Sequence, residues 1–351
     1  MPTILDVAKY AGVSVTTVSR VINNSSHPVN PETRTIVMKA IEALDFVPNQ
    51  LARALASDRT RLIGVIVGDG SDPYFANIVR GISASAQENG YLTIICNTER
   101  IPEVELDFLK LLRDYSADGI IFAGGGLINS NCKDELIEIV TNLHARHVPL
   151  IALSNQYLDM PQVKIDDVLA AREMMEHLIA LGHRRIGFVT GPLALVTSLL
   201  RLDGYKQALE EFSIAYDPGL VIEGDFTYES GRQAADQLMS RENPPSAIFG
   251  SNDREALGCL FKLRELNIQV PEQVSVAGFD DIETTQYVNP PLTTVHVPMQ
   301  TIGVLGVKQF MQALGGTKPI EPVYHVPHNL VIRASTAPPA ERSNAAPFLK
   351  T

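Results

Sequence analysis

The stretch SVTTVSR, residues 14 to 20, combines small hydroxyl side chains with an arginine. The guanidinium of Arg20 could donate two hydrogen bonds to the edge of a guanine, and a methyl group of Val15 or Thr16 could contact a thymine. Three neighbouring hydroxyls could bind phosphate oxygens of a DNA backbone: Ser14, Thr17 and Ser19. This combination indicates a surface that contacts DNA.

A second group of candidate residues follows short apolar runs farther along the chain. Carboxylate, amide, guanidinium and aromatic groups come soon after five such runs: Tyr74, Phe75, Asn155, Thr197, Arg201, Asn252, Asp253 and Asp280. In open parallel sheets, ligands bind beyond the carboxyl ends of the strands. Acids and amides bond to ring hydroxyls and an aromatic ring covers the C–H face of a sugar. These residues therefore predict a pocket for a small sugar-like effector.

Each of these side chains also has a structural interpretation. Asp253 could cap the helix that begins near Arg254, Asp280 could cap another, and Tyr74 could belong to a hydrophobic core. Only their shared position at strand ends favours a pocket. His183 and His296 are interpreted as structural or surface histidines, because the sequence places no second metal-binding group near either.

The first sixty residues show helical periodicity only. Apolar residues recur every three or four positions in three segments: Ile4, Val7, Ala8 and Ala11; Val18, Val21 and Ile22; Val37, Ala40, Ile41 and Leu44. Thr3 with Asp6 predicts a capping box, Gly12 a tight turn, and Asn30-Pro31 the start of the third helix. The first two helices and their turn fit a helix-turn-helix; the alternative is a plain three-helix bundle with solvated hydroxyls.

Beyond residue 61 the pattern changes to strands that alternate with helices. The apolar runs RLIGVIV, YLTIIC, DGIIFAG, VPLIAL, RIGFVTG, SAIFGS and VSVAGFD suit strands buried on both faces. Such alternation predicts parallel sheets with right-handed crossovers, in a chain long enough for two α/β lobes. The expected fold is a small all-α head followed by a two-lobed α/β body.

The expected boundaries divide the chain into four parts. The head occupies residues 1–47, a linking segment 48–60, the body 61–338 and a flexible tail 339–351. In the body, the first lobe is expected at 61–162 and 294–325, and the second at 163–293 and 326–338.

The charge of the chain is unevenly distributed. The net charge is -11, yet residues 1 to 61 contain seven Lys and Arg against five Asp and Glu. An acidic body repels nucleic acid, so any DNA contact must come from the head. Three cysteines without metal-ligand spacing predict buried thiols in a reducing compartment, and no cofactor or metal is expected. Without an apolar signal core or membrane-spanning run, the expected location is cytoplasmic, with no membrane partner.

Several stretches together resemble the LacI/GalR family of bacterial repressors. TILDVAKYAGVSVTTVSRVIN and TRTIVMKAIEALDFVPNQLARAL match its N-terminal signature, and GHRRIGFVTGP, SNDREALG and VSVAGFDDIE match later blocks. The resemblance runs from residue 3 to about 338. It implies a periplasmic-binding-protein-like body and a repressor that binds a pseudo-palindromic operator as a homodimer, under the control of an effector between the lobes.

The resemblance also implies roles for particular residues. Residues 48–57 align with a hinge helix that enters the minor groove, where Leu55 would wedge between bases, Ala52 would lie near the groove floor, and Asn49 and Arg53 would lie near the backbone. Ten residues are too few for a stable isolated helix, so this segment should order only against a partner. The alternative is an ordinary linker helix with Leu55 packed on the body.

In the pocket, the resemblance adds two residues to the candidate set, Asp166 and Phe226. It assigns Arg201 and Asp280 to the pair that brackets a ligand's polar edge, and Phe226 to ring stacking. Leu195 stands where purine-responsive relatives place an arginine, which argues against a purine effector.

Two other function classes fit parts of the sequence. A nucleotide-dependent enzyme would use a glycine motif, but Pro73 stands where the third glycine after Gly68 and Gly70 belongs, and no nucleophile elbow is present. A free-standing sugar receptor would share the body but not the helix-turn-helix. We therefore expect a regulator and not an enzyme.

Overall fold

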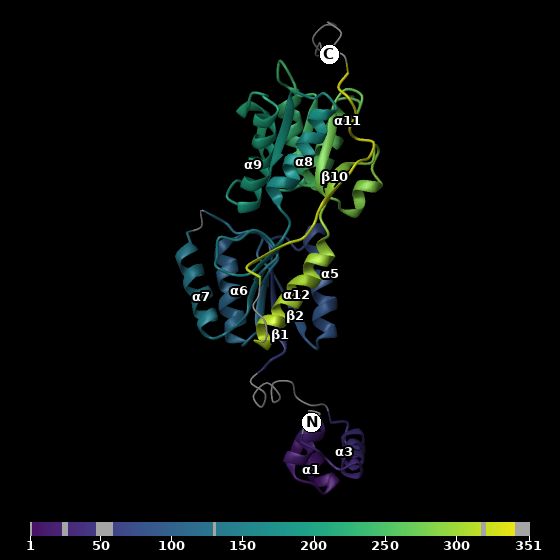
Figure 1. Cartoon of the computed structure of the whole chain (residues 1–351). Helices are drawn as coiled ribbons and strands as arrows, with labels where there is room; N and C mark the ends of the chain where they lie inside the picture. The colour runs from purple at the N-terminus through teal and green to yellow at the C-terminus, as the bar shows by residue number, and fades with distance from the viewer. Residues whose placement is uncertain (1, 23–26, 47–58, 129–130, 317–320, 341–351) are drawn as a thin grey trace. The chain divides into compact units, whose positions relative to one another are not determined.

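The computed structural model describes residues 2–22, 27–46, 59–128, 131–316 and 321–340, and the chain forms two compact units, Met1–Arg61 and Leu62–Thr351 (Figure 1). The expected tail beyond residue 340 lies outside the described residues. The two units are considered separately below.

The first unit contains three helices, as the periodicity predicted: α1 (Ile4–Ala11), α2 (Val15–Ile22) and α3 (Pro31–Ala43). The capping box is confirmed, because Thr3 Oγ1 accepts from the Asp6 N–H and the Thr3 N–H donates to the Asp6 carboxylate. Gly12 ends α1 with φ 66°, a left-handed conformation that needs no Cβ. The three helices meet around a small apolar core: Val7, Ala8, Val18, Val21, Val37 and Ala40.

The second unit contains two six-stranded sheets. The first has the order β11-β5-β4-β3-β1-β2 and the second β12-β10-β9-β8-β6-β7. Every strand pair is parallel except β10 with β12. The strands of the first sheet are β1 (Leu62–Val67), β2 (Leu92–Asn97), β3 (Gly119–Phe122), β4 (Leu150–Ala152), β5 (Gln162–Lys164) and β11 (Val323–His325). Those of the second are β6 (Ile186–Thr190), β7 (Val221–Glu223), β8 (Ala247–Gly250), β9 (Ser275–Asp280), β10 (Thr293–His296) and β12 (Asn329–Val331).

Helices cover both faces of each sheet, so the central strands β1, β3, β6, β8 and β9 are buried as expected of a parallel architecture, whereas the outer strands β2, β7, β11 and β12 are partly or fully exposed. Helices α5 (Pro73–Glu88) and α12 (Met299–Gly315) pack together on the first sheet, and α6 (Pro102–Asp114) and α7 (Lys133–Ala145) pack with the opposite core (Figure 1). In the second lobe, α8 (Asp167–Ala180) packs with α9 (Val196–Glu211), and α10 (Tyr228–Met239) with α11 (Asp253–Glu265). Two short 3₁₀ helices are η1 (Pro218–Leu220) and η2 (Glu283–Gln286).

The chain passes between the two sheets three times, after β5, after β10 and after β11. The expected lobe boundary at residue 294 differs from this path. β10 pairs with β9, so residues 294–296 belong to the second lobe and the return to the first lobe begins after them. The sequence of β10 shows a strand but does not indicate which of the two sheets that strand joins.

The run YLTIIC forms β2 but is not buried on both faces. β2 pairs with β1 alone at the rim of the sheet, and Leu92, Ile94 and Ile95 are 65, 37 and 44% exposed. An edge position removes one neighbour that an apolar strand would otherwise have. The sequence therefore identified the strand but not its place in the sheet.

Candidate functional site

Helix α2 separates its side chains into a packed face and an exposed face. Val18 and Val21 are buried in the core, whereas Val15, Thr16 and Arg20 are exposed. The three residues expected to contact base edges therefore share the outer side of the helix. An exposed arginine and two methyl groups on a short helix can read a major groove.

The hydroxyls at the start of α2 have local partners. Ser14 Oγ accepts from the Thr17 N–H at 3.1 Å and lies 2.9 Å from Thr17 Oγ1, so Ser14 caps the helix. Ser14 is exposed, while Thr17 and Ser19 are half-buried. A DNA phosphate bound here would therefore contact the hydroxyls of Ser14 and Thr17, which already stabilise the N-terminus of α2. The predicted hinge contacts Asn49, Ala52, Arg53 and Leu55 lie outside the described residues.

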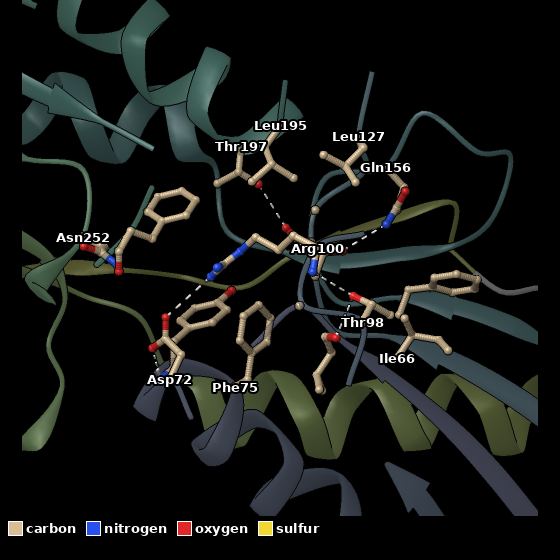
Figure 2. A pocket seen from close by; sticks show the side chains of 18 of the residues that line it. Ile66, Asp72, Phe75, Thr98, Arg100, Leu127, Gln156, Leu195, Thr197 and Asn252 are labelled. Atoms are coloured by element: carbon tan, nitrogen blue, oxygen red, sulfur yellow. Dashed lines mark hydrogen bonds and ion pairs between the residues drawn. The ribbon is translucent and has the colours of Figure 1, made fainter. Parts of the chain in front are cut away.

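In the second unit, one pocket gathers most of the predicted effector residues (Figure 2). Seven of them line it: Tyr74, Phe75, Thr197, Arg201, Phe226, Asn252 and Asp280. They come from both lobes, from positions that follow β1, β6, β7 and β8 and from the last residue of β9. The rule that ligands bind beyond the carboxyl ends of parallel strands therefore located the pocket.

Three predicted effector residues are not part of this lining, and each has a structural partner. Asn155 donates to Asp167 Oδ2 at 2.6 Å and accepts from the Lys164 ammonium. Asp166 caps α8 by accepting from the Leu169 N–H. Asp253 is fully buried and accepts from Thr294 Oγ1 at 2.6 Å and from the Ile282 N–H at 2.8 Å. Burial raises the pKa of Asp253 to about 8 despite these bonds.

Arg201 and Asp280 lie together in the wall of the pocket. Arg201 Nε donates to Asp167 Oδ1 at 2.8 Å, and its guanidinium lies 3.6 Å from the centre of the Phe279 ring. Asp280 Oδ1 is 3.8 Å from Arg201 Nη2 and has no hydrogen-bond partner among the described residues. Burial raises the pKa of Asp280 well above its ordinary value. A buried carboxyl oxygen that faces the pocket without a donor is suited to a ligand hydroxyl.

The aromatic ring of Phe226 is held in place by backbone contacts. Phe226 has φ 67°, and its N–H donates to Glu255 Oε1 at 2.9 Å while its carbonyl accepts from Asn252 Nδ2 at 3.2 Å. The ring lies against Gly191, where a Cβ would come within 2.1 Å of Phe226 Cζ. Burial raises the pKa of Glu255 to about 8. Asn252 thus lines the pocket and also bonds to the backbone of Phe226, a second lining residue.

The structure adds lining residues that sequence reasoning missed, among them Asp72, Arg100 and Glu105. Arg100 follows β2, so the strand-end rule could have found it, and Asp72 caps α5 just before Tyr74. Glu105 gives no such signal, because it lies within α6 beside core leucines. Its carboxyl faces the pocket, and burial raises its pKa to about 7.

The opposite part of the lining is mostly apolar, with Ile66, Phe122, Leu127 and Leu195. Leu127 and Leu195 join the two lobes through a backbone bridge. Within the described ranges no group of three or more His, Cys, Asp or Glu side chains is placed to hold a metal ion. No helix in the described part of the chain is long and apolar enough to cross a bilayer.

Comparison with known proteins connects both units to one family. Residues 3–49 match the model of bacterial regulatory proteins of the lacI family, and residues 175–336 match a periplasmic binding protein-like domain. The HTH-type transcriptional regulator DegA of Bacillus subtilis (strain 168) is 35% identical over 338 residues, covering 96% of this chain and 98% of DegA.

Two solved structures extend the likeness to the fold. The lac repressor dimer bound to operator and the anti-inducer ONPF has a TM-score of 0.85 at 29% identity, covering 96% of this chain and 99% of that one. The transcriptional regulator CelR in complex with cellobiose has a TM-score of 0.71 at 30% identity, covering 95% and 100%.

Proposed function

Since the chain belongs to the LacI family of bacterial regulatory proteins, we propose that it represses transcription by binding operator DNA as a homodimer in the cytoplasm. Each head would place α2 in a major groove, with Arg20, Thr16 and Val15 against base edges and Ser14, Thr17 and Ser19 near phosphates. One such module contacts too little DNA for genomic specificity, so two half-sites related by two-fold symmetry are needed. The relatives described above are transcriptional regulators, which supports a regulatory and not a catalytic role.

The effector is a small sugar-like molecule held between the lobes. The observation that carries this proposal is Asp280 Oδ1, a buried acceptor beside Arg201 without a donor in the described structure, in a pocket that the Phe226 ring also lines. A ring hydroxyl supplies the missing donor, and its C–H face stacks on the aromatic ring. That CelR was solved with cellobiose and the lac repressor with ONPF supports the same class.

Exposed apolar side chains support the homodimer. Leu92 and Ile95 on the edge strand β2, and Phe261 and Tyr287 in the second lobe, are 65, 44, 56 and 78% exposed. A second copy of the chain would cover them and remove apolar area from water.

The test uses the full-length protein, operator DNA and a panel of sugars. We expect one or more sugars to raise the melting temperature and to change operator affinity, because a ligand coupled to DNA binding must itself bind with altered affinity to the DNA complex. Titrating the active sugar with and without operator measures this reciprocity. Equal affinity in both titrations would contradict the regulatory role, and stabilisation by purines alone would contradict the interpretation of Leu195.

The hinge contacts are proposed from the family resemblance. Asn49, Ala52, Arg53 and Leu55 would enter the minor groove, with Leu55 unstacking a base step at a cost of a few kcal/mol that added contacts offset. Leu55→Ala should reduce both operator affinity and the bend measured by circular-permutation gel shift. If affinity and bend both stay unchanged, Leu55 is not the wedge.

A further inference from the structure

Arg100 is directed into the pocket by a constrained turn. It follows β2, and both Glu99 and Arg100 have left-handed backbones, with φ 51° and 59°. The turn is held by Thr98, whose Oγ1 donates to the Val67 carbonyl at 3.0 Å and accepts from the Arg100 N–H at 3.2 Å. The stem of Arg100 then passes over Gly68, where a Cβ would lie 3.2 Å from Arg100 Cγ. Two successive non-glycine residues in this conformation persist only where surrounding contacts enforce them.

The guanidinium of Arg100 lies among aromatic rings with few polar partners (Figure 2). Its central carbon is 6.0 Å from the centre of the Phe75 ring in the first lobe and 5.4 Å from that of Phe226 in the second. The nearest carboxylate, Asp72, is 3.9 Å from Nη2, beyond hydrogen-bond distance. Among the described residues, no hydrogen bond from this guanidinium is found, although the group carries five donors.

The other two arginines around the pocket are each bonded to a carboxylate. Arg201 donates to Asp167 at 2.8 Å, and Arg254 to Asp69 at 2.9 Å. Asp72, the carboxylate near Arg100, is closer to Arg254, at 3.3 Å. The two remaining acids of the lining do not pair with Arg100: among the described residues, Asp280 lies 3.8 Å from Arg201 and no ion pair joins Asp280 or Glu105 to Arg100. Arg100 is thus a cation of the pocket whose guanidinium N–H groups are available to bind a ligand.

We propose that the effector carries an anionic group, a carboxylate or a phosphate, which Arg100 binds through paired N–H donors while the sugar ring occupies the part of the pocket beside Asp280. The proposal deepens the sugar-effector function proposed above and rests on it. A guanidinium matches the geometry of either anion with two parallel hydrogen bonds. The class of effector is then a sugar acid or a sugar phosphate, not a neutral sugar.

A different role for Arg100 makes a different prediction. If the residue only joined the lobes by stacking on Phe226 and pairing with Asp72, its removal would weaken every ligand that needs closed lobes, whatever the ligand's charge. If it binds the anion, its removal weakens charged ligands and spares their neutral parents. The ratio of the two affinities therefore separates the roles.

The experiment is calorimetric titration of the full-length protein with matched pairs: D-galactose with D-galacturonate, D-glucose with D-glucuronate, and D-glucose with D-glucose 6-phosphate. In at least one pair the acid should bind about 10- to 100-fold more tightly than its parent, the range expected for hydrogen bonds to a charged group. Arg100→Gln should remove that preference by weakening binding of the acid far more than binding of its neutral parent. Arg113→Gln, on the far end of α6 beside Asp114, is the matched control and should change neither affinity.

The possible results distinguish an error in the anion proposal from an error in the sugar-effector proposal. Preference for a carboxylate or for a phosphate identifies which anion the site takes. Neutral sugars that bind as tightly as their acids and alter operator affinity would overturn the anion proposal while upholding the sugar-effector function. An equal loss for both members of a pair in Arg100→Gln would make Arg100 a lobe contact only. If no sugar, acid or phosphate binds, both proposals are wrong.

Discussion

At the scale of single residues, Phe226 shows how the pocket wall depends on a missing side chain. Its ring occupies the space above Gly191, and a Cβ there would stand 2.1 Å from Cζ. Gly191→Ala should therefore displace the ring or strain the turn at residue 226, at a cost of about 1–3 kcal/mol, the range for an overpacked core. We expect a lower melting temperature and weaker effector binding. Gly70→Ala is the control, since a Cβ at that position would lie 3.6 Å from its nearest neighbouring atom. An equal loss of stability and effector binding in Gly70→Ala would show that the contact between residue 191 and Phe226 is not the cause.

Arg20 gives a prediction about sequence discrimination. It is exposed on the outer side of α2, whereas Val18 and Val21 pack inside, so its truncation leaves the core of the head intact. Arg20→Ala should cost about 1–3 kcal/mol of discrimination at one base pair, with a smaller effect on binding to random DNA. Fluorescence anisotropy with single-base operator variants at fixed salt measures both. Uniform weakening on all sequences would indicate a phosphate contact instead.

At the scale of elements, Asp281 ties three strand ends of the second lobe together. Its carboxylate accepts from Arg333 Nη2 at 2.6 Å, after β12, and lies 2.9 Å from His296 Nδ1 at the end of β10. Burial acts to raise the pKa of Asp281, but the bonds from Arg333 and His296 outweigh it and hold the pKa below its ordinary value. The stabilisation is therefore complete above the unfolded pKa, near 4, and is lost as the pH falls through the lowered folded pKa.

Asp281→Asn should reduce the free energy of unfolding by roughly 1.5–3 kcal/mol near pH 7, as expected for hydrogen bonds to a charged group. The gap between wild type and variant should begin to narrow below about pH 4, where the carboxylate of the unfolded chain takes up its proton, and should close as the pH falls through the lowered pKa of the folded protein. Urea unfolding at several pH values measures this gap. Asp107→Asn, on the exposed side of α6, is the control and should stay close to wild type. A gap that is constant with pH would show that the charge of Asp281 does not matter.

The elements were largely predictable because their signals are local. Apolar runs identified β1, β3, β4, β6, β8 and β9, and Thr3 with Asp6 marked the start of α1. What the sequence could not show depends on tertiary contacts: that β2 lies at an edge, that β10 joins the second sheet, and that Asp253 turns inward to Thr294. Glu105 was missed in the pocket for the same reason, since its position follows from helix packing that no periodicity records, whereas Arg100 follows β2 and the strand-end rule could have found it.

At the scale of the whole molecule, the part that binds DNA and the part that binds the effector carry opposite net charges. The head carries a small positive excess, while residues after 61 contain 35 Asp and Glu against 22 Lys and Arg. A weakly basic head binds DNA with few phosphate contacts, so operator occupancy depends on pairing two heads and on the state of the body. We therefore expect small conformational changes in the body to alter operator occupancy strongly, because neither head alone binds the DNA tightly.

Ion pairs between the two lobes of the body bear on whether the lobes are open or closed. Arg254, from α11 in the second lobe, has Nη1 2.9 Å from Asp69 and 3.3 Å from Asp72, both in the first lobe, and its side chain is 13% exposed. Asp72 also accepts from the Tyr74 N–H at the start of α5. The same carboxylate therefore holds the lobes together and positions a lining residue of the pocket, although Arg254 itself is not part of the lining.

Arg254→Gln should shift the lobes toward an open state and weaken effector binding by about tenfold or more, since loss of one partner leaves buried charges unpaired. Unlike Arg100→Gln, it should weaken a neutral sugar and its acid equally, because Arg254 touches the lobes and not the ligand. Titration of a matched pair measures the affinities, and small-angle X-ray scattering measures the opening. Arg146→Gln, an exposed arginine after α7, is the control. Unchanged affinity together with unchanged scattering would mean that the Asp69 and Asp72 pairs do not hold the lobes closed, and that closure rests on the contacts around Phe226 and the Leu127–Leu195 bridge.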